Sequence, residues 1–170
     1  MVTRWHLINL PVRLVGRARH WTVVENVVIS WPAGQVEGFT LHSGPFRTLF
    51  LPVGPGVAIT PTGIEFAHRG LVERRSRRWV KQKIREDWVT RRIPVHDALD
   101  QLLGNIKDAV IDEKTVEVTD LVISQGLLAD LLAGSLRLPL ATLALNENGP
   151  EETKIHELGH AKREADKTPK

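Results

Sequence analysis

Cysteine is absent from this chain of 170 residues. A disulfide bond, a zinc site with cysteine ligands and a thiol nucleophile are therefore excluded, and the absence suits a reducing compartment. Long apolar runs are also missing: the amino-terminal segment MVTRWHLINLPVRLVG has no continuous hydrophobic stretch, and the leucine-rich segment 126–145 is broken by Asp130 and Arg137. We therefore expect neither a signal peptide nor a membrane span, and we expect a cytoplasmic protein.

The sequence also lacks the residue patterns of common catalytic sites. It has no phosphate-binding loop followed by a helix, no dinucleotide fingerprint and no serine, histidine and aspartate set. Its carboxylates, such as Glu25, Glu37 and Asp120, are scattered, and no pair has a spacing that demands acid–base chemistry. We predict a protein that is not an enzyme and that uses no cofactor.

Basic residues are concentrated in one segment. The chain has 23 Lys and Arg against 20 Asp and Glu, which gives a net charge of only +3. Residues 69–92 hold ten of the basic residues and three of the acidic ones, which leaves 13 basic and 17 acidic residues in the rest of the chain. This segment is therefore the first place to look for a surface that meets an anionic partner.

The segment 21–42, WTVVENVVISWPAGQVEGFTLH, has the pattern of a β-hairpin. Apolar Val23, Val27 and Ile29 share one parity, which predicts a half-buried strand with one apolar face. The residues Pro-Ala-Gly at 32–34 favour a turn, and alternation resumes over 35–41. We expect two antiparallel strands here.

The segment 7–16 is predicted to be a short leader followed by a strand that ends at a turn at Gly16. Further short strands are predicted over 46–53, 57–60 and 64–68, because alternating segments are separated there by glycine and proline. Many short strands in fewer than 70 residues predict a small, highly curved antiparallel sheet. Such a sheet is expected to close into a barrel, since closure removes exposed edges.

The segment 71–89 changes to a helical pattern. Val72, Val80, Ile84 and Trp88 fall at intervals of four residues or multiples of four, and most other positions are Arg or Lys. This predicts a basic amphipathic helix that ends before Pro94, with a strand over 78–83 as the alternative.

The second half of the chain echoes the first. VEVTDLVIS at 116–124 resembles TVVENVVIS at 22–30, with Asp120 in the place of Asn26. The returning strand is replaced by QGLLADLLAGS, which favours a short helix before Gly134, and an apolar strand is expected over 136–145. We predict four parts: a first barrel unit over 1–68, a basic helical linker over 69–96, a second, degenerate unit over 97–148 and a charged flexible tail over 149–170.

The leader LINLPV, the hairpin ENVVISWPAGQVEGFTL and the closing segment FLPVGPGVAITPTGIEF resemble the PRC-barrel domains. This family includes the barrel of the photosynthetic reaction centre H subunit and the carboxy-terminal domain of the ribosome maturation factor RimM. A weaker resemblance covers residues 97–146. The basic stretch at 16–20 and the segment 69–92 depart from the family pattern. The resemblance implies a mainly β fold with a small closed antiparallel PRC-type barrel, repeated in degenerate form, and a scaffold without an active site.

We therefore expect an adaptor that binds another protein through the basic segment or a barrel edge. Association with RNA or the ribosome is the alternative, since arginines contact phosphates and indoles stack on bases. An anionic membrane surface is less favoured, a homo-oligomer is a further alternative, and the plainest interpretation is a helix that only packs between two barrels. The candidate binding residues are Arg74, Arg75, Arg77, Arg78, Trp79, Lys81, Lys83, Arg85 and Trp88.

The tail contains one metal-site motif. His156, Glu157 and His160 fit the pattern H-E-x-x-H, in which two histidines one helical turn apart bind zinc and the glutamate activates water. A hydrolase also needs a third ligand and a substrate cleft, and here Glu164 is the nearest candidate ligand. Adventitious metal binding by His156 and His160, or a solvated helix without metal, is therefore favoured over zinc hydrolysis.

Overall fold

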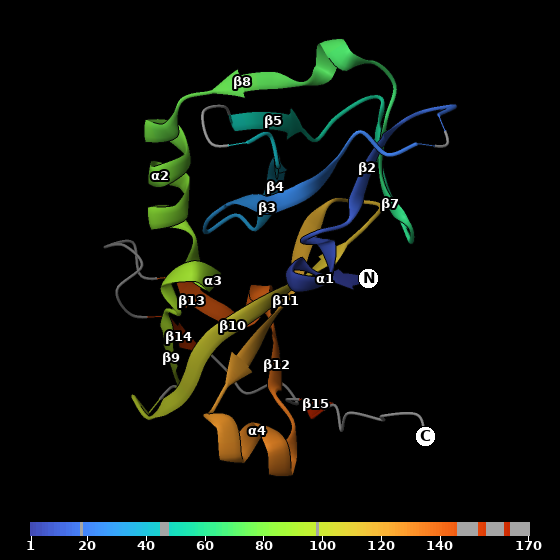
Figure 1. Ribbon diagram of the computed structural model, residues 1–170. Coiled ribbons are helices and arrows are strands. Elements are labelled where there is room, and N and C mark those ends of the chain that lie inside the picture. The colour runs from blue at the N-terminus through green and yellow to red at the C-terminus, as the bar shows by residue number, and fades with distance from the viewer. Residues whose placement is uncertain (18, 45–47, 98, 146–152, 156–161, 164–170) are drawn as a thin grey trace. The chain divides into compact units, whose positions relative to one another are not determined.

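The computed structural model describes residues 1–17, 19–44, 48–97, 99–145, 153–155 and 162–163 (Figure 1). The protein is mainly β, as predicted. Its chain forms two compact units. Unit 1 consists of Met1–Asp87 and Ile111–Glu117, and unit 2 consists of Trp88–Val110 and Val118–Lys170. The expected linker over 69–96 is thus divided between the two units after Asp87.

Unit 1 is built on a curled mixed sheet. Its strands are hydrogen-bonded in the order β8-β5-β4-β3-β2-β7-β6. The elements of unit 1 are β1 (Val2–Thr3), α1 (Arg4–Leu7), β2 (Pro11–Leu14), β3 (Thr22–Ser30), β4 (Gln35–Leu41), β5 (Thr48–Pro52), β6 (Val57–Thr60), β7 (Gly63–Phe66), the 3-10 turn η1 (Arg69–Leu71), β8 (Glu73–Arg75) and α2 (Arg77–Glu86).

The predicted hairpin is confirmed by the antiparallel pair β3 and β4. The turn between them closes with a hydrogen bond from the Gly34 N–H to the Ser30 carbonyl at 2.8 Å. Gly34 has a φ of 70°, which a residue without a Cβ adopts at little cost. Gly34 therefore forms the turn that the Pro-Ala-Gly sequence predicted.

The predicted separation of β3 into one apolar and one mixed face is wrong. Val24 is fully buried whereas Val23 is only half-buried, and Val28 is buried beside Val27 and Ile29. The register with β4 shifts between Val24 and Asn26 and again between Val28 and Ile29. Each register shift moves the residues that follow it to the other face of the strand. Residues at both odd and even positions of β3 are therefore buried in the core.

The prediction of a purely antiparallel sheet is also corrected. β2 pairs in parallel with β7, with Val12 opposite Ile64 and Leu14 opposite Phe66. Parallel pairing needs a long connection, which the residues between these strands provide. Within the described residues the hydrogen-bonded path of unit 1 ends at β6 and β8, so a closed cylinder is not shown.

The core of unit 1 draws on most of its strands and on α1. Close packing is visible where Gly38 of β4 crosses β5, since a Cβ at Gly38 would lie 2.3 Å from the carbonyl oxygen of Leu51. The largest fully buried side chains of this unit are those of Leu7, Val12, Val24, Phe39, Leu41, Leu51, Ile64, Phe66 and Ile111.

The predicted continuous helix over 71–89 is too long. Glu73–Arg75 forms β8, which pairs with β5 in antiparallel register. The helix α2 covers Arg77–Glu86, and a separate short helix, α3, covers Trp88–Arg91. The helical interpretation is right for the middle of the segment, and the alternative of a strand over 78–83 is wrong.

Unit 2 contains the long antiparallel strands β10 and β11, of which the residues nearest their connecting turn belong to unit 1. The expected single strand over 136–145 is interrupted after Pro139, which has no N–H for a ladder. The elements that follow unit 1 are α3, β9 (Pro94–His96), β10 (Leu102–Asp112), β11 (Glu117–Ser124), α4 (Leu127–Ala133), β12 (Leu136–Pro139), the 3-10 turn η2 (Leu140–Thr142), β13 (Leu143–Leu145), β14 (Thr153–Ile155) and β15 (Lys162–Arg163).

The short helix predicted after β11 is present as α4. Its end is closed by Gly134, whose N–H donates to the Asp130 carbonyl at 3.1 Å and whose φ is 74°. Residues 102–104 are the start of the eleven-residue strand β10 and do not form a separate segment like the one that precedes β2. The internal repeat is therefore not shown by the arrangement of elements.

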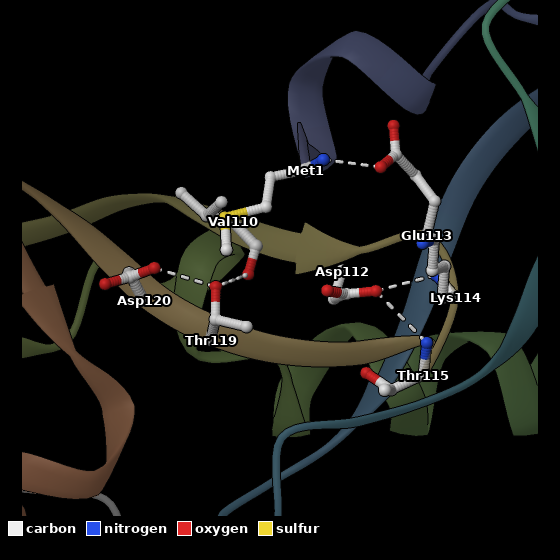
Figure 2. A network of polar contacts seen from close by, with 8 residues as sticks. All are labelled: Met1, Val110, Asp112, Glu113, Lys114, Thr115, Thr119 and Asp120. Atoms are coloured by element: carbon white, nitrogen blue, oxygen red, sulfur yellow. Dashed lines mark hydrogen bonds and ion pairs between the residues drawn. The ribbon is translucent and has the colours of Figure 1, made fainter.

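Asp112 fixes the turn between β10 and β11 within unit 1 (Figure 2). Its Oδ1 accepts hydrogen bonds from the backbone N–H groups of Lys114 at 2.7 Å and Thr115 at 3.2 Å. These bonds favour the charged form and lower the pKa of the Asp112 carboxyl. Figure 2 also shows a contact within unit 2, where the Thr119 hydroxyl donates to Asp120 Oδ2 at 2.7 Å.

Candidate partner-binding surface

The basic residues singled out in the sequence lie on β8 and α2 of unit 1, with Trp88 on α3 of unit 2. β8 pairs with β5 and extends the sheet by one short strand. Leu49 lies opposite Arg74, and Phe50 lies opposite Glu73. Both arginines of β8, Arg74 and Arg75, belong to the predicted set.

The helix α2 starts directly after β8. Ser76 is its N-cap, and the Ser76 hydroxyl oxygen accepts a hydrogen bond from the Trp79 N–H at 3.2 Å. Asp87 follows the last turn and donates its N–H to the Ile84 carbonyl at 3.4 Å. Local sequence therefore determines both ends of the basic helix.

One face of α2 packs on unit 1 through Trp79. The Trp79 ring meets the buried ring of Phe50 in an edge-to-face arrangement, with centroids 4.9 Å apart and an interplanar angle of 63°. The Arg75 guanidinium lies 5.4 Å from the Phe50 centroid and 5.2 Å from the Trp79 centroid, within cation–π range of both rings. Trp79 and Arg75 therefore help to attach the helix.

Lys83 lies one turn further along the same face. Its Nζ is 2.6 Å from Glu37 Oε1 on β4 and 4.0 Å from Glu86 Oε2. Because Lys83 is largely shielded from solvent and has two acidic neighbours, its charge is matched within unit 1. It is a poor candidate for contact with a partner.

The opposite face of α2 is basic and exposed. Arg78, Lys81 and Arg85 are separated by three and four residues, which places them on one side of a helix, and all three are exposed. Arg74 on β8 and Arg77 at the start of the helix are exposed as well. We call these residues the basic surface: Arg74, Arg77, Arg78, Lys81 and Arg85.

The charge of the first turn of α2 opposes helix stability. Arg77 and Arg78 are its first two residues, and the turn contains no acidic residue. The start of a helix carries partial positive charge, so cations there cost free energy, whereas Arg85 in the last turn is favourable. The helix dipole therefore gives no stabilising role to Arg78.

Trp88 is not part of this surface. Its side chain is only 5% exposed, so it cannot offer a face to a base or to a partner. Trp79 is half-buried against Phe50. Neither indole is therefore presented as an open stacking platform beside the arginines, which is what the nucleic-acid interpretation required.

A buried polar network, which the sequence patterns did not predict, anchors the end of α2. Arg4 and Asp87 are 7% and 4% exposed, and Arg4 Nη2 lies 3.1 Å from Asp87 Oδ2. Arg4 Nη2 also donates to Asn26 Oδ1 at 2.6 Å, and Trp31 Nε1 donates to Asp87 Oδ1 at 3.1 Å. The only hint in the sequence is an acidic residue that directly follows a basic helix.

The metal-site motif of the tail lies outside the described residues, so the structure does not place His156, Glu157 or His160. Among the residues that are described, no group of three or more His, Asp or Glu side chains could hold a metal ion. The structure thus adds nothing to the zinc interpretation.

No helix in the described part of the chain combines the length and the apolar character needed to cross a membrane.

No family model matches the sequence, and no curated protein matches it. The resemblance to PRC-barrel domains therefore depends on the residue patterns alone.

Proposed function

We propose that this protein is a non-catalytic, mainly β scaffold that binds an acidic protein partner through the basic surface. The observation that carries the proposal is that the two faces of α2 have different roles. Trp79 and Lys83 hold the helix to unit 1, while Arg78, Lys81 and Arg85 are exposed on the opposite side. Arginine on a rigid, packed element can form paired hydrogen bonds to carboxylates with little loss of side-chain order.

A protein partner is favoured over RNA at this surface. Phosphates would also be attracted to the basic surface, yet stacking of bases needs accessible aromatic rings. Trp88 is buried and Trp79 packs against Phe50. A membrane surface is less favoured still, because the indole of Trp79 is engaged within unit 1 instead of being available to the lipid interface.

The proposed scaffold is PRC-barrel-like. The hairpin of β3 and β4 and the order of the following short strands support this, although the sheet path of the described residues is open. Asn26 and Asp120, equivalent in the proposed repeat, each accept a hydrogen bond from an arginine: Arg4 at 2.6 Å and Arg137 at 2.9 Å. We propose a closed barrel, a degenerate second copy and a cytoplasmic location. Solution contacts between β6 and β8 would test closure.

The binding proposal is tested by capture from a nuclease-treated native extract. Single charge reversals, Arg78→Glu, Lys81→Glu and Arg85→Glu, are compared with the wild-type chain and with Lys114→Glu. Lys114 is an exposed residue in the turn between β10 and β11 and provides the same change in charge away from α2. The expected result is a set of partners that each α2 reversal reduces about fivefold or more, the effect of losing a well-formed charged contact.

Two results would contradict the proposal. Partners that are lost equally with Lys114→Glu would indicate a general effect of net charge. Partners that disappear when nuclease is added, in every variant, would indicate that RNA and not a protein occupies the surface. A homo-oligomer would be recognised in the same experiment, because the captured partner would be the chain itself.

A further inference from the structure

A second basic region of unit 1 surrounds a cavity of about 720 Å³. It lies next to β2 and β7, at residues that the proposed function does not use. Its polar lining comes from the loop after β2 and from η1, and its apolar lining includes the end of β7. The residues that matter for the argument are Arg17, Arg19, His20, Trp21, Phe66 and Arg69.

The described part of the lining is positively charged and contains no carboxylate. Arg17, Arg19 and Arg69 border the same cavity, and the described lining residues include neither Asp nor Glu. Three guanidinium groups around one hollow attract an anion to it. Arginine also binds phosphate through paired N–H donors, so the arrangement suits a phosphorylated ligand.

The same cavity contains an exposed indole. The Trp21 side chain is 38% exposed, although its ring lies 5.7 Å from the ring of fully buried Phe66 at an interplanar angle of 43°. The Arg69 guanidinium lies 5.8 Å from the Trp21 centroid. The backbone N–H of Trp21 donates to the Val12 carbonyl at 2.8 Å, which ties the backbone of this residue to β2. The indole is therefore held in place while part of it faces solvent.

We propose that this cavity binds a nucleotide, with its phosphate on the arginines and its base stacked on Trp21. A lone phosphate would leave the indole without a role, and an apolar ligand would cover three charges without compensating them. The cavity volume is in the range of small-molecule sites and exceeds the size of one nucleotide. A free nucleotide and one unit of single-stranded RNA share this chemistry.

The pocket supplies what the basic surface of α2 lacks. On α2 Trp79 is half-buried against Phe50, whereas Trp21, which also contacts a phenylalanine, is exposed and borders the cavity together with the arginines. Arginine planes and aromatic rings are the usual stacking partners of unpaired bases. Nucleotide binding here does not depend on the protein partner proposed for α2, because the two sites share no residue.

The test is calorimetric titration of the full chain with ADP, with a six-nucleotide single-stranded RNA, with adenosine and with inorganic phosphate, at one fixed ionic strength. The pocket variant is Arg17→Gln with Arg19→Gln, and Arg69→Gln is a second, single variant. The matched control is Arg78→Gln with Arg85→Gln, which removes two exposed positive charges from α2.

The expected result is saturable binding of ADP, weakened about tenfold or more in both pocket variants and changed less than about twofold in the control. Phosphate and adenosine should each bind about tenfold more weakly than ADP, since each makes only one of the two contacts. Binding of the RNA without ADP would support the pocket and identify the polymer as the source of the nucleotide.

Three results would overturn the proposal. The first is no binding of either ADP or RNA. The second is equal weakening by the pocket variants and by the α2 control, which would indicate attraction by net charge. The third is phosphate binding as tight as that of ADP, which would deny a role to the indole. Because none of these involves a protein partner, failure here would leave the adaptor proposal standing.

Discussion

Asp87 joins the end of α2 to a buried polar network of unit 1. It accepts hydrogen bonds from both Arg4 and Trp31, and it is almost completely buried. A buried arginine that loses its counter-charge keeps the cost of desolvation without the compensating attraction. Removal of one partner is therefore expected to lower the free energy of unfolding by more than the intact network contributes to it.

The substitution Asp87→Asn is predicted to lower the free energy of unfolding by about 3–5 kcal/mol, because it leaves the buried Arg4 charge without its counter-charge. Urea denaturation measures this change. The double variant Arg4→Met with Asp87→Asn should lose less than the single variant, since it removes the uncompensated charge. A loss below about 1 kcal/mol in the single variant would mean that water reaches Arg4.

Asp130 should make the stability of unit 2 sensitive to acid. Burial raises the pKa of its carboxyl, but hydrogen bonds from the Ser124 hydroxyl at 2.7 Å and the Gln125 N–H at 3.1 Å, together with Lys107, lower the pKa further, so the net shift is downward. A folded pKa below the unfolded one stabilises the protein above the unfolded value of about 3.9. That contribution is lost as the pH falls through the lowered pKa.

The variant Asp130→Asn is accordingly predicted to flatten the fall in stability between about pH 5 and pH 3, relative to the wild-type chain. Denaturant midpoints of both proteins over this range provide the measurement. Parallel curves for the two proteins would show that the pKa of Asp130 is the same in the folded and the unfolded state.

Among the elements of unit 1, β4 and β5 approach each other closely at Gly38. A Cβ at Gly38 would lie 2.3 Å from the Leu51 carbonyl oxygen and 2.6 Å from the Phe50 ring, and backbone cannot yield as a flexible side chain can. We predict that Gly38→Ala lowers the unfolding free energy by about 2 kcal/mol or more. Gly54→Ala is the control, because no atom lies within 4 Å of a Cβ there. Similar effects of both substitutions on the chemical denaturation midpoint would contradict the packing.

The helix α2 offers a matched pair of charge reversals. Arg78→Glu places an anion in the first turn and should raise stability by about 0.3–1 kcal/mol, whereas Arg85→Glu in the last turn should lower it by a similar amount. Thermal unfolding at low salt measures both, and about 1 M salt should erase the difference. Changes of the same sign in the two variants would contradict the inference that Arg78 lowers the stability of α2.

The sequence predicted the elements of unit 1 better than their faces and directions. Alternation and turn residues located β3, β4, β6 and the helical part of 71–89. Two register shifts in β3 and the parallel pairing of β2 with β7 depend on contacts between distant segments, which a local pattern does not contain.

The binding residues were predicted in position but not in orientation. Amphipathic spacing places an apolar stripe on the segment, but only the fold shows that Trp79 reaches Phe50 and that Trp88, which belongs to unit 2, is buried. The sequence does not distinguish Lys83 and Arg75 from the other basic residues of the segment, because their partners Glu37 and Phe50 lie on other strands. Composition identified the segment, and tertiary contacts selected its exposed residues.

At the scale of the whole molecule, the basic segment is not a separable linker. α2 belongs to unit 1 and Trp88 begins unit 2, while residues Ile111–Glu117 return to unit 1. Removal of residues 69–92 would therefore delete β8, α2 and the Arg4 partner Asp87 together. Point substitutions on the exposed face are the appropriate test, because they leave these supports in place.

The most direct measurement is photo-crosslinking in a native extract, with a photoreactive residue at position 81 in the intact chain and, in a second preparation, at position 114. Both positions are exposed lysines of unit 1, but only the first belongs to the basic surface. The account predicts discrete protein adducts, resistant to nuclease, from position 81 and not from position 114. The same adducts from both positions, or only nuclease-sensitive adducts from position 81, would contradict it.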